Sequence, residues 1–206
     1  MTQSRLVLQG NWSEPVSSGN DHDAYLKTLE RFGCRCQYCG LETRSTPQSP
    51  LGYFDICVKD AALSNDPINW VPLCKICSDL NDLTKLYRKG TFIEAPWLSQ
   101  GRLTNLLIIR YGVAFRPEED WGSIKNACEQ FGLAIDSTPR EWDGVAWGGE
   151  PEKLLSLLDQ LVHPLENQSY ANKLRFRFNA DAYEDAIRFW ASGMAVKLQA
   201  ITGESV

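Results

Sequence analysis

The chain has 206 residues, of which 43% are hydrophobic and 23% are charged, a composition typical of a soluble globular protein with a buried core. Acidic residues outnumber basic ones by 26 to 21, which gives a formal net charge of −5 and a pI near 5.1. Proteins that bind nucleic acid through its phosphates usually carry a basic face and a domain pI above about 9. The overall charge therefore argues against a nucleic-acid-binding protein.

The sequence also indicates a compartment. No apolar run approaches the roughly 20 residues needed to cross a bilayer, and the first residues lack the apolar core of a signal peptide. The cysteines number seven, and four of them form two Cys-x-x-Cys pairs. This pattern favours metal binding in a reducing compartment over a disulfide framework. We therefore expect a cytoplasmic protein.

The first predicted elements are a short strand in residues 5–12 and a helix in residues 22–32. Gly33 is expected to end this helix, because glycine readily adopts the left-handed conformation found after helix ends. Three large side chains recur at helical spacing and should share one buried face: Tyr25, Leu29 and Phe32. The helix leads directly into the cysteine-rich part of the chain.

Two Cys-x-x-Cys hooks follow, Cys36 with Cys39 and Cys74 with Cys77, on either side of a strand predicted in residues 53–58. Two such hooks from distant parts of a chain typically form a tetrahedral site of four thiolates, which structural zinc prefers. Four thiolates leave no coordination position for water or substrate. The sequence therefore predicts one structural Zn²⁺ and no catalytic metal at the hooks.

The three cysteines outside the hooks are either alternative metal ligands or structural residues. Cys34 lies two residues before the first hook and is the main rival ligand, whereas Cys57 and Cys128 lack a partner hook and are expected to be small core residues. The alternative for the hooks themselves is four reduced cysteines in the core. Gly40 favours the metal reading, because it permits the tight turn that points backbone N–H groups at the thiolates.

The second half of the chain is predicted to be mostly helical. Residues 91–96 are expected to be extended and residues 135–150 to form a loop. Helices are predicted in residues 78–87 before Gly90, from the capping residue Ser99 to Tyr111, in residues 118–131 before Gly132, from Pro151 to Leu165, and from Asp181 onward. The apolar stripe of the last helix is formed by Tyr183, Ile187, Trp190, Met194 and Ile201. The predicted class is α+β, mostly helical, around a small zinc-bound β-hairpin.

Residues 31–40 and 65–77 resemble the zinc-stapled form of the HNH endonucleases. In that family an Asp-His pair on the strand between the hooks supplies the general base, an Asn before the second hook orients the loop, and a His or Asn after it binds the catalytic metal. Asn69 matches the middle Asn. However, no histidine lies near Asp55, and neither His nor Asn directly follows the second hook. The resemblance thus implies an HNH-like ββα zinc module without the catalytic residues.

Catalysis of phosphodiester hydrolysis with one metal needs a base that deprotonates water and ligands that hold Mg²⁺. The two histidines of the chain, His22 and His163, lie outside the module. Asp55 and Asp79 could hold a cation, but no residue near them can replace the imidazole. We therefore interpret the module as a degenerate nuclease fold and the protein as not an enzyme.

Two further segments resemble the IcmJ/DotN family of the Dot/Icm (type IVB) secretion system. They are residues 90–107, GTFIEAPWLSQGRLTNLL, and residues 173–178, KLRFRF, with a later helix that ends in FWA. The resemblance implies a cytoplasmic adaptor, peripheral to the inner-membrane secretion complex, that has an HNH-like fold and one structural zinc. Its implied partners are the C-terminal segment of the hexameric coupling ATPase and other coupling-complex subunits, and its implied role is to help recruit secreted substrates.

On this reading the chain is a single domain of residues 1–206, with the HNH-like zinc module in residues 31–90 and a helical portion in residues 91–206. Candidates for the partner surface are Trp97, Leu106, Trp142 and Trp147, because aromatic side chains dominate interface hot spots. A single tryptophan is more often a core residue, but glycines flank the loop positions 142 and 147. Two alternatives remain: a zinc-dependent nucleic-acid binder, if residues 85–110 form a basic face, and a divergent HNH nuclease.

Overall fold

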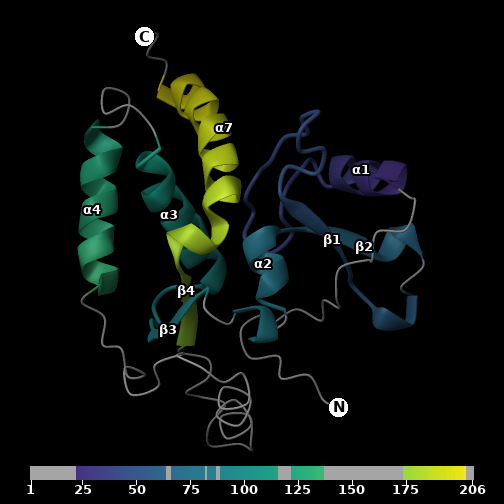
Figure 1. The fold of residues 1–206 in the computed structure, drawn as a ribbon, viewed down its shortest axis with the longest axis horizontal. Coiled ribbons are helices and arrows are strands. Elements are labelled where there is room, and N and C mark those ends of the chain that lie inside the picture. Colours follow the sequence, from purple (N-terminus) through teal and green to yellow (C-terminus); the bar gives the residue numbers. More distant parts are fainter. Residues whose placement is uncertain are drawn as a thin grey trace, which may run out of the picture.

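The computed structural model describes residues 22–63, 66–81, 83–86, 89–115, 122–136 and 174–202. Within these ranges the chain is α+β and mostly helical, with two small antiparallel sheets (Figure 1), as the sequence predicts. The predicted strand in residues 5–12, the predicted helix from Pro151 to Leu165 and most of the predicted loop in residues 135–150 lie outside the described residues.

Helix α1 (His22–Arg31) confirms the first predicted helix. Tyr25 and Leu29 are buried, because their spacing puts both on the face that meets the sheet beside the helix. Gly33 and Cys34 follow with φ angles of +61° and +52°, and the Cys34 N–H donates to the Leu29 carbonyl oxygen at 2.9 Å. These left-handed residues end the helix and turn the chain toward the first hook.

Strands β1 (Phe54–Val58) and β2 (Trp70–Cys74) form the first sheet, and β1 confirms the strand predicted in residues 53–58. The strands are antiparallel, with Phe54 opposite Cys74 and Val58 opposite Trp70. The register places the second hook at the end of β2, beside the start of β1.

Helix α2 (Lys75–Asp79) shows that the helix predicted in residues 78–87 is wrong. Cys74 is still extended, with a ψ of 155°, so the helix begins directly after it. The helix then ends at Asp79, where the Asn81 N–H donates to the Ser78 carbonyl in a tightened turn, and asparagine favours such turns over helix. A short 3₁₀ helix, η3 (Leu83–Leu86), follows.

The second sheet pairs β3 (Gly90–Glu94) with β4 (Leu174–Phe178), which comes from far along the chain. Phe92 lies opposite Phe176, and both side chains are buried. Gly90 begins this strand, so the prediction that it stops a helix is wrong. A Cβ atom on Gly90 would lie 2.2 Å from the Arg177 carbonyl oxygen, so the two strands can approach only because this residue has no side chain.

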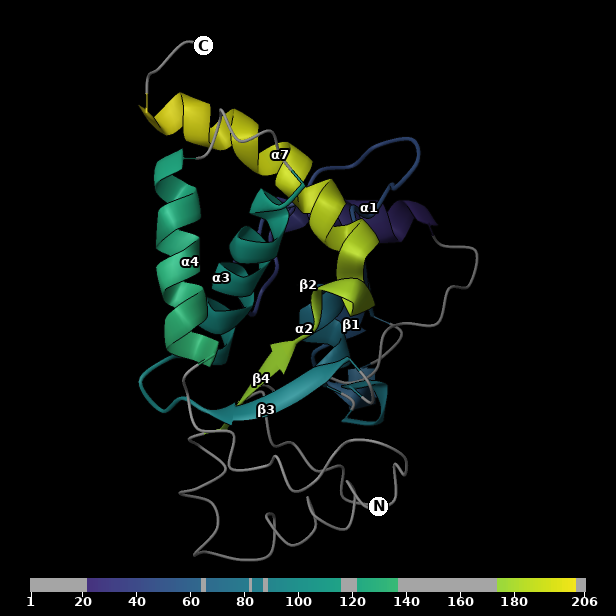
Figure 2. The ribbon, with the colours of Figure 1, turned by 60° about the vertical axis from the view of Figure 1, so that its left-hand side comes forward.

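Helix α3 (Gln100–Val113) confirms the predicted helix and its cap, because the Ser99 hydroxyl accepts a hydrogen bond from the Arg102 N–H at 3.3 Å. Leu103 and Leu107 are fully buried. Helix α3 lies among the other elements of the second half of the chain and packs against α4, α7 and β4 (Figure 2).

Helix α4 (Gly122–Asp136) continues through Gly132, so the prediction that this glycine follows the helix is wrong. A Cβ atom at this position would lie 2.6 Å from Cζ of Arg110 on α3. The glycine therefore permits the close packing of the Arg110 guanidinium group against α4, and it is not a helix-end signal.

The last elements are a 3₁₀ turn, η5 (Ala180–Tyr183), and helix α7 (Glu184–Thr202), close to the predicted start at Asp181. Tyr183, Ile187 and Trp190 of the predicted stripe are buried, whereas the side chains of Met194 and Ile201 lie outside the described part. One buried cluster runs from Leu29 on α1, through the hooks, to Trp190 on α7. Among the described helices, none is both long and apolar enough to span a membrane.

Candidate metal centre

The first hook lies in a tight loop between two short extended segments. Arg35 and Glu42 form an isolated antiparallel bridge, and within it the Cys36 N–H donates to the Leu41 carbonyl at 2.8 Å. The Gly40 N–H donates back to the Cys36 carbonyl at 2.9 Å, and Gly40 has a φ of +75°. The loop therefore needs a glycine after the second cysteine, and it points the Cys36 and Cys39 side chains to one side.

The second hook lies where β2 becomes α2. Cys74 is the last residue of the strand and the N-cap of the helix, and Cys77 lies one turn later. The first hook is attached to this segment by a hydrogen bond from the Gln37 N–H to the Pro72 carbonyl at 3.0 Å. Two local turns, each set by its own hydrogen bonds, thus face one another.

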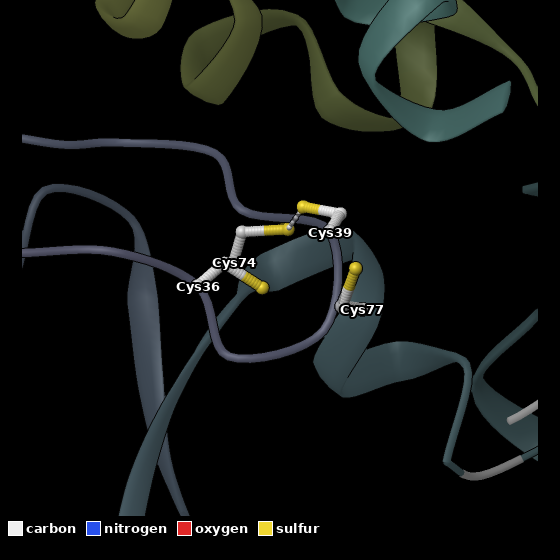
Figure 3. Close-up of side chains that lie close together, drawn as sticks. All are labelled: Cys36, Cys39, Cys74 and Cys77. Atoms are coloured by element: carbon white, nitrogen blue, oxygen red, sulfur yellow. Dashed lines mark hydrogen bonds between the residues drawn. The ribbon is translucent and has the colours of Figure 1, made fainter. Parts of the chain in front are cut away.

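The four hook sulfurs come together at this junction (Figure 3). All four Sγ atoms lie within 4.8 Å of one another, and Cys39 Sγ lies 3.8 Å from Cys74 Sγ. A zinc ion with Zn–S bonds of about 2.3 Å would set tetrahedral sulfurs about 3.8 Å apart, whereas a disulfide needs about 2.05 Å. The sulfurs are free thiols with the spacing of a metal cage, and the cluster could hold one metal ion.

The protonation of the four sulfurs is linked. Burial raises the pKa of Cys74 and of Cys77 well above the ordinary thiol value. Hydrogen bonds from the thiols of Cys39, Cys74 and Cys77 lower the pKa of Cys36 strongly. A negative charge is therefore stabilised at Cys36, whereas deprotonation of Cys74 and Cys77 costs free energy. A bound divalent cation would offset this cost.

The helical half of the molecule supports this cage directly. Asn105 on α3 donates from Nδ2 to the Cys39 carbonyl at 2.6 Å. A Cβ atom on Gly101 would lie only 3.3 Å from the Cys39 Cα, so α3 packs tightly against the hook. Tyr38 is half-buried within the first hook, and burial, followed by the nearby Cys77, raises the pKa of its hydroxyl to about 12.

The other cysteines lie outside the cluster. Cys34, the rival ligand, is half-buried and does not belong to the group of four sulfurs. Cys57 on β1 is fully buried, and its sulfur lies 3.8 Å from the Ser78 hydroxyl. Cys128 is half-buried on α4. The cluster thus contains the four cysteines of the hooks and none of these three.

A second cluster of charged groups lies on the other side of α2. The two carboxylates that the sequence singles out as cation ligands, Asp55 and Asp79, both face the Lys75 ammonium group. Lys75 Nζ lies 3.1 Å from Asp55 Oδ2 and 3.4 Å from Asp79 Oδ1, the latter an ion pair without hydrogen-bond geometry. Burial lowers the pKa of Lys75, but the two carboxylates outweigh it and raise that pKa above the ordinary value.

Asp79 has two further partners from distant elements. Its Oδ2 lies 2.5 Å from Lys89 Nζ, just before β3, and it accepts a hydrogen bond from the Tyr183 hydroxyl at 3.0 Å. Asp79 itself is 1% exposed. Spacing predicts the Lys75–Asp79 pair, since residues four apart face each other on a helix, but no sequence signal points to Lys89 or Tyr183.

Asn69, which matches the loop-orienting Asn of the HNH family, closes the connection between β1 and β2. Its Nδ2 donates to the carbonyls of Asp60 at 2.6 Å and Leu63 at 3.1 Å, and its Oδ1 accepts from the Asp60 N–H at 3.0 Å. His22 is exposed at the start of α1 and belongs to neither cluster, and His163 lies outside the described residues. The side chain of Asn69 therefore orders a loop.

The four partner-surface candidates have different positions. Trp97 is 62% exposed in the turn between β3 and α3. Leu106 is half-buried on α3 and packs against the core. Trp142 and Trp147 lie outside the described residues. Of the two described candidates, Trp97 is the one with a side chain open to a partner.

No family model matches the chain, and no curated protein matches it.

Proposed function

We propose that the four hook cysteines hold one structural Zn²⁺ and that the protein acts by binding, as a zinc-stabilised adaptor. A tetrahedral set of four sulfurs is typical of zinc or of iron–sulfur centres. Each cysteine pair lies in its own local turn, one at the end of a strand and one closed by a glycine, and both pairs face a single point. This arrangement is typical of a site that holds one zinc ion. Such an ion would hold the hooks together and would have no position left for water.

The order of elements supports an HNH-like module. The antiparallel pair β1–β2 is followed directly by α2, which gives the ββα order; the first hook precedes β1, and the second begins at the last residue of β2. The hydrogen bonds of Asn69 also agree with the loop-ordering role that the resemblance implies.

The non-catalytic reading depends on one observation above all: lysine ammonium groups lie against the carboxylates that a nuclease would need for its metal. Lys75 contacts both Asp55 and Asp79, and Lys89 contacts Asp79. A divalent cation at this point would have to displace a bonded ammonium group and would be repelled by its charge. The same contacts count against nucleic-acid binding, because Lys75 and Lys89 are already paired with carboxylates.

The adaptor role follows from the resemblance to the IcmJ/DotN family. On this proposal the protein is a cytoplasmic subunit at the periphery of a type IV coupling complex, it binds the C-terminal segment of the coupling ATPase, and it helps recruit secreted substrates. The exposed Trp97 is a suitable contact for such a segment, because large aromatic side chains contribute much of the energy of interfaces.

A pull-down tests this function. The tagged chain is recovered from native lysate of the source cells, bound proteins are identified by mass spectrometry, and zinc is measured in the same sample. We expect the coupling ATPase and one zinc per chain. A matched variant, Trp97→Ala, should retain the zinc and recover less ATPase.

Two results would contradict the proposal. Co-purified nucleic acid without the ATPase would indicate the zinc-dependent nucleic-acid binder. Metal-dependent cleavage of plasmid that Asn69→Ala abolishes would indicate a divergent nuclease.

A further inference from the structure

A groove lies where residues 40–44, directly after the first hook, meet helices α3 and α7. Its volume is about 440 Å³, within the range of pockets that bind small ligands or parts of peptides. Residues 40–44 form one side, and α3 and α7 form the others. The α3 residues that line it, Asn105 and Ile109, flank the half-buried Leu106.

The walls of the groove are mostly apolar, and hydrogen bonds hold part of them in place. Trp190 is buried, and its indole N–H donates to the Gly52 carbonyl at 2.9 Å, which fixes the ring. Thr43 donates to the same carbonyl at 2.7 Å. Leu41, Ile109 and Phe189 complete the apolar lining.

Two glycines leave the groove open. A Cβ atom on Gly40 would meet nothing within 4 Å, and one on Gly193 would meet only Arg44 Nε, at 4.0 Å. A side chain at either position would therefore enter free space. The groove has room for a bulky apolar side chain from another molecule.

The charge of the groove comes mainly from one basic residue, Arg44. The Arg44 guanidinium lies 5.7 Å from the centre of the Phe189 ring and donates to the Ser192 hydroxyl at 2.8 Å. In the part of the chain that the structure describes, no carboxylate forms an ion pair with Arg44. Glu42, which also lines the groove, is bonded to Arg35. The lining therefore carries an uncompensated positive charge beside an apolar hollow.

We propose that this groove binds an extended peptide through a bulky apolar side chain that lies next to an acidic group. The hollow takes the apolar side chain, and Arg44 pairs with the carboxylate. The inference rests on the proposed adaptor function in taking a peptide as the occupant, and it adds the place and the chemistry of the contact.

The smallest probe with this chemistry is N-acetyltryptophan, which has an indole ring, an amide and a carboxylate. It is added to the ¹⁵N-labelled full chain, and N-acetyltryptophanamide, which lacks the charge, serves as the matched ligand. We expect the acid to shift the amide signals of Gly40 and Gly193 with a dissociation constant on the order of 1 mM, and the amide to bind several-fold more weakly.

Two variants test the groove itself. Gly193→Leu fills it and should abolish the shifts at Gly40, while the better helix propensity of leucine favours α7. Arg44→Gln should weaken binding of the acid about fivefold to tenfold and leave binding of the amide unchanged. Asp185→Leu, an exposed position on the same helix, is the control and should bind as the wild type does.

Equal binding of the acid and the amide would overturn the proposal, as would full binding by Gly193→Leu. The two proposals can also fail separately. An ATPase that binds the wild type and Gly193→Leu equally would exclude the groove and leave the adaptor function intact. Binding of N-acetyltryptophan in the groove, with no ATPase recovered in the pull-down, would retain the groove and exclude the adaptor function.

Discussion

Asp79 is a buried carboxylate whose oxygens face two ammonium groups and one phenol, from Lys75, Lys89 and Tyr183. A buried charge is tolerated only when it is paired and hydrogen-bonded, so each of these contacts matters for stability. At the scale of single residues, Asp79 is thus the centre of a structural ion-pair cluster.

The hydroxyl of Tyr183 is the part of this cluster that can be removed most cleanly. Tyr183→Phe keeps the ring and deletes a hydrogen bond to a charged acceptor, and it should cost about 1.5–3 kcal/mol of the free energy of unfolding. The control is Tyr111→Phe, which deletes a hydrogen bond to the neutral Phe178 carbonyl and should cost about 0.5–1.5 kcal/mol. Urea denaturation measures both. A loss for Tyr183→Phe no greater than that for Tyr111→Phe would contradict the role given to Asp79.

Cys57 offers a second test at this scale. Burial raises the pKa of its thiol to about 12. Because the thiolate is the reactive form, Cys57 should stay unlabelled by iodoacetamide at pH 8.5 in the folded protein, whereas the half-buried Cys34 should react. As the pH rises from about 9 toward 12, the unfolded state would lose this proton first, so the contribution of Cys57 to stability falls over that range. Peptide mass spectrometry reads the labelling, and comparable rates at the two cysteines would refute the assignment.

At the scale of elements, the sequence predicts what local signals determine. Helix α3 has its Ser99 cap and α1 has its Gly33 end, and both form as expected. The pairing of β3 with β4 could not be predicted, because their contacts join distant parts of the chain. The four hook cysteines could be predicted from their spacing alone, whereas the contact of Asp79 with Tyr183 depends on how two remote elements pack.

Gly132 illustrates how a tertiary contact overrides a local signal. In most helices Gly→Ala stabilises by about 0.5–1 kcal/mol, but here the new Cβ would meet the Arg110 guanidinium. The guanidinium is the far end of a flexible side chain and has to move to make room, so Gly132→Ala should give less than the usual gain in the wild type. In the Arg110→Ala background the same change should give the usual gain. Thermal or urea denaturation of the four proteins measures the coupling, and an equal effect of Gly132→Ala in both backgrounds would exclude the contact.

At the scale of the whole molecule, the short helix α2 joins the two clusters. It carries the ligand candidate Cys77 on one side and Asp79 on the other, and Asp79 contacts Tyr183 beside α7. On the proposed function, loss of the metal should loosen the hooks first and then the contact with the start of α7. Helix α4, which packs on α3, should be affected least.

Hydrogen–deuterium exchange with and without a chelator follows this order. We expect chelation to increase exchange strongly in residues 36–43 and 70–79, moderately in η5, and little in α4. Cys36→Ser should reproduce the pattern without chelator. A uniform increase over all described elements would mean that the hooks and the helices unfold as one unit, and the proposed order would then be wrong.

The central claim is that the four hook cysteines hold one structural zinc ion. Native mass spectrometry of the full chain measures its metal content directly, with Cys74→Ser as the test variant and Cys34→Ser as the control. The account predicts one zinc per chain in the wild type and in Cys34→Ser, and none in Cys74→Ser, which should also melt at a lower temperature because zinc binding is linked to folding. A wild-type chain without metal, or a Cys74→Ser variant that keeps both its zinc and its melting temperature, would contradict it.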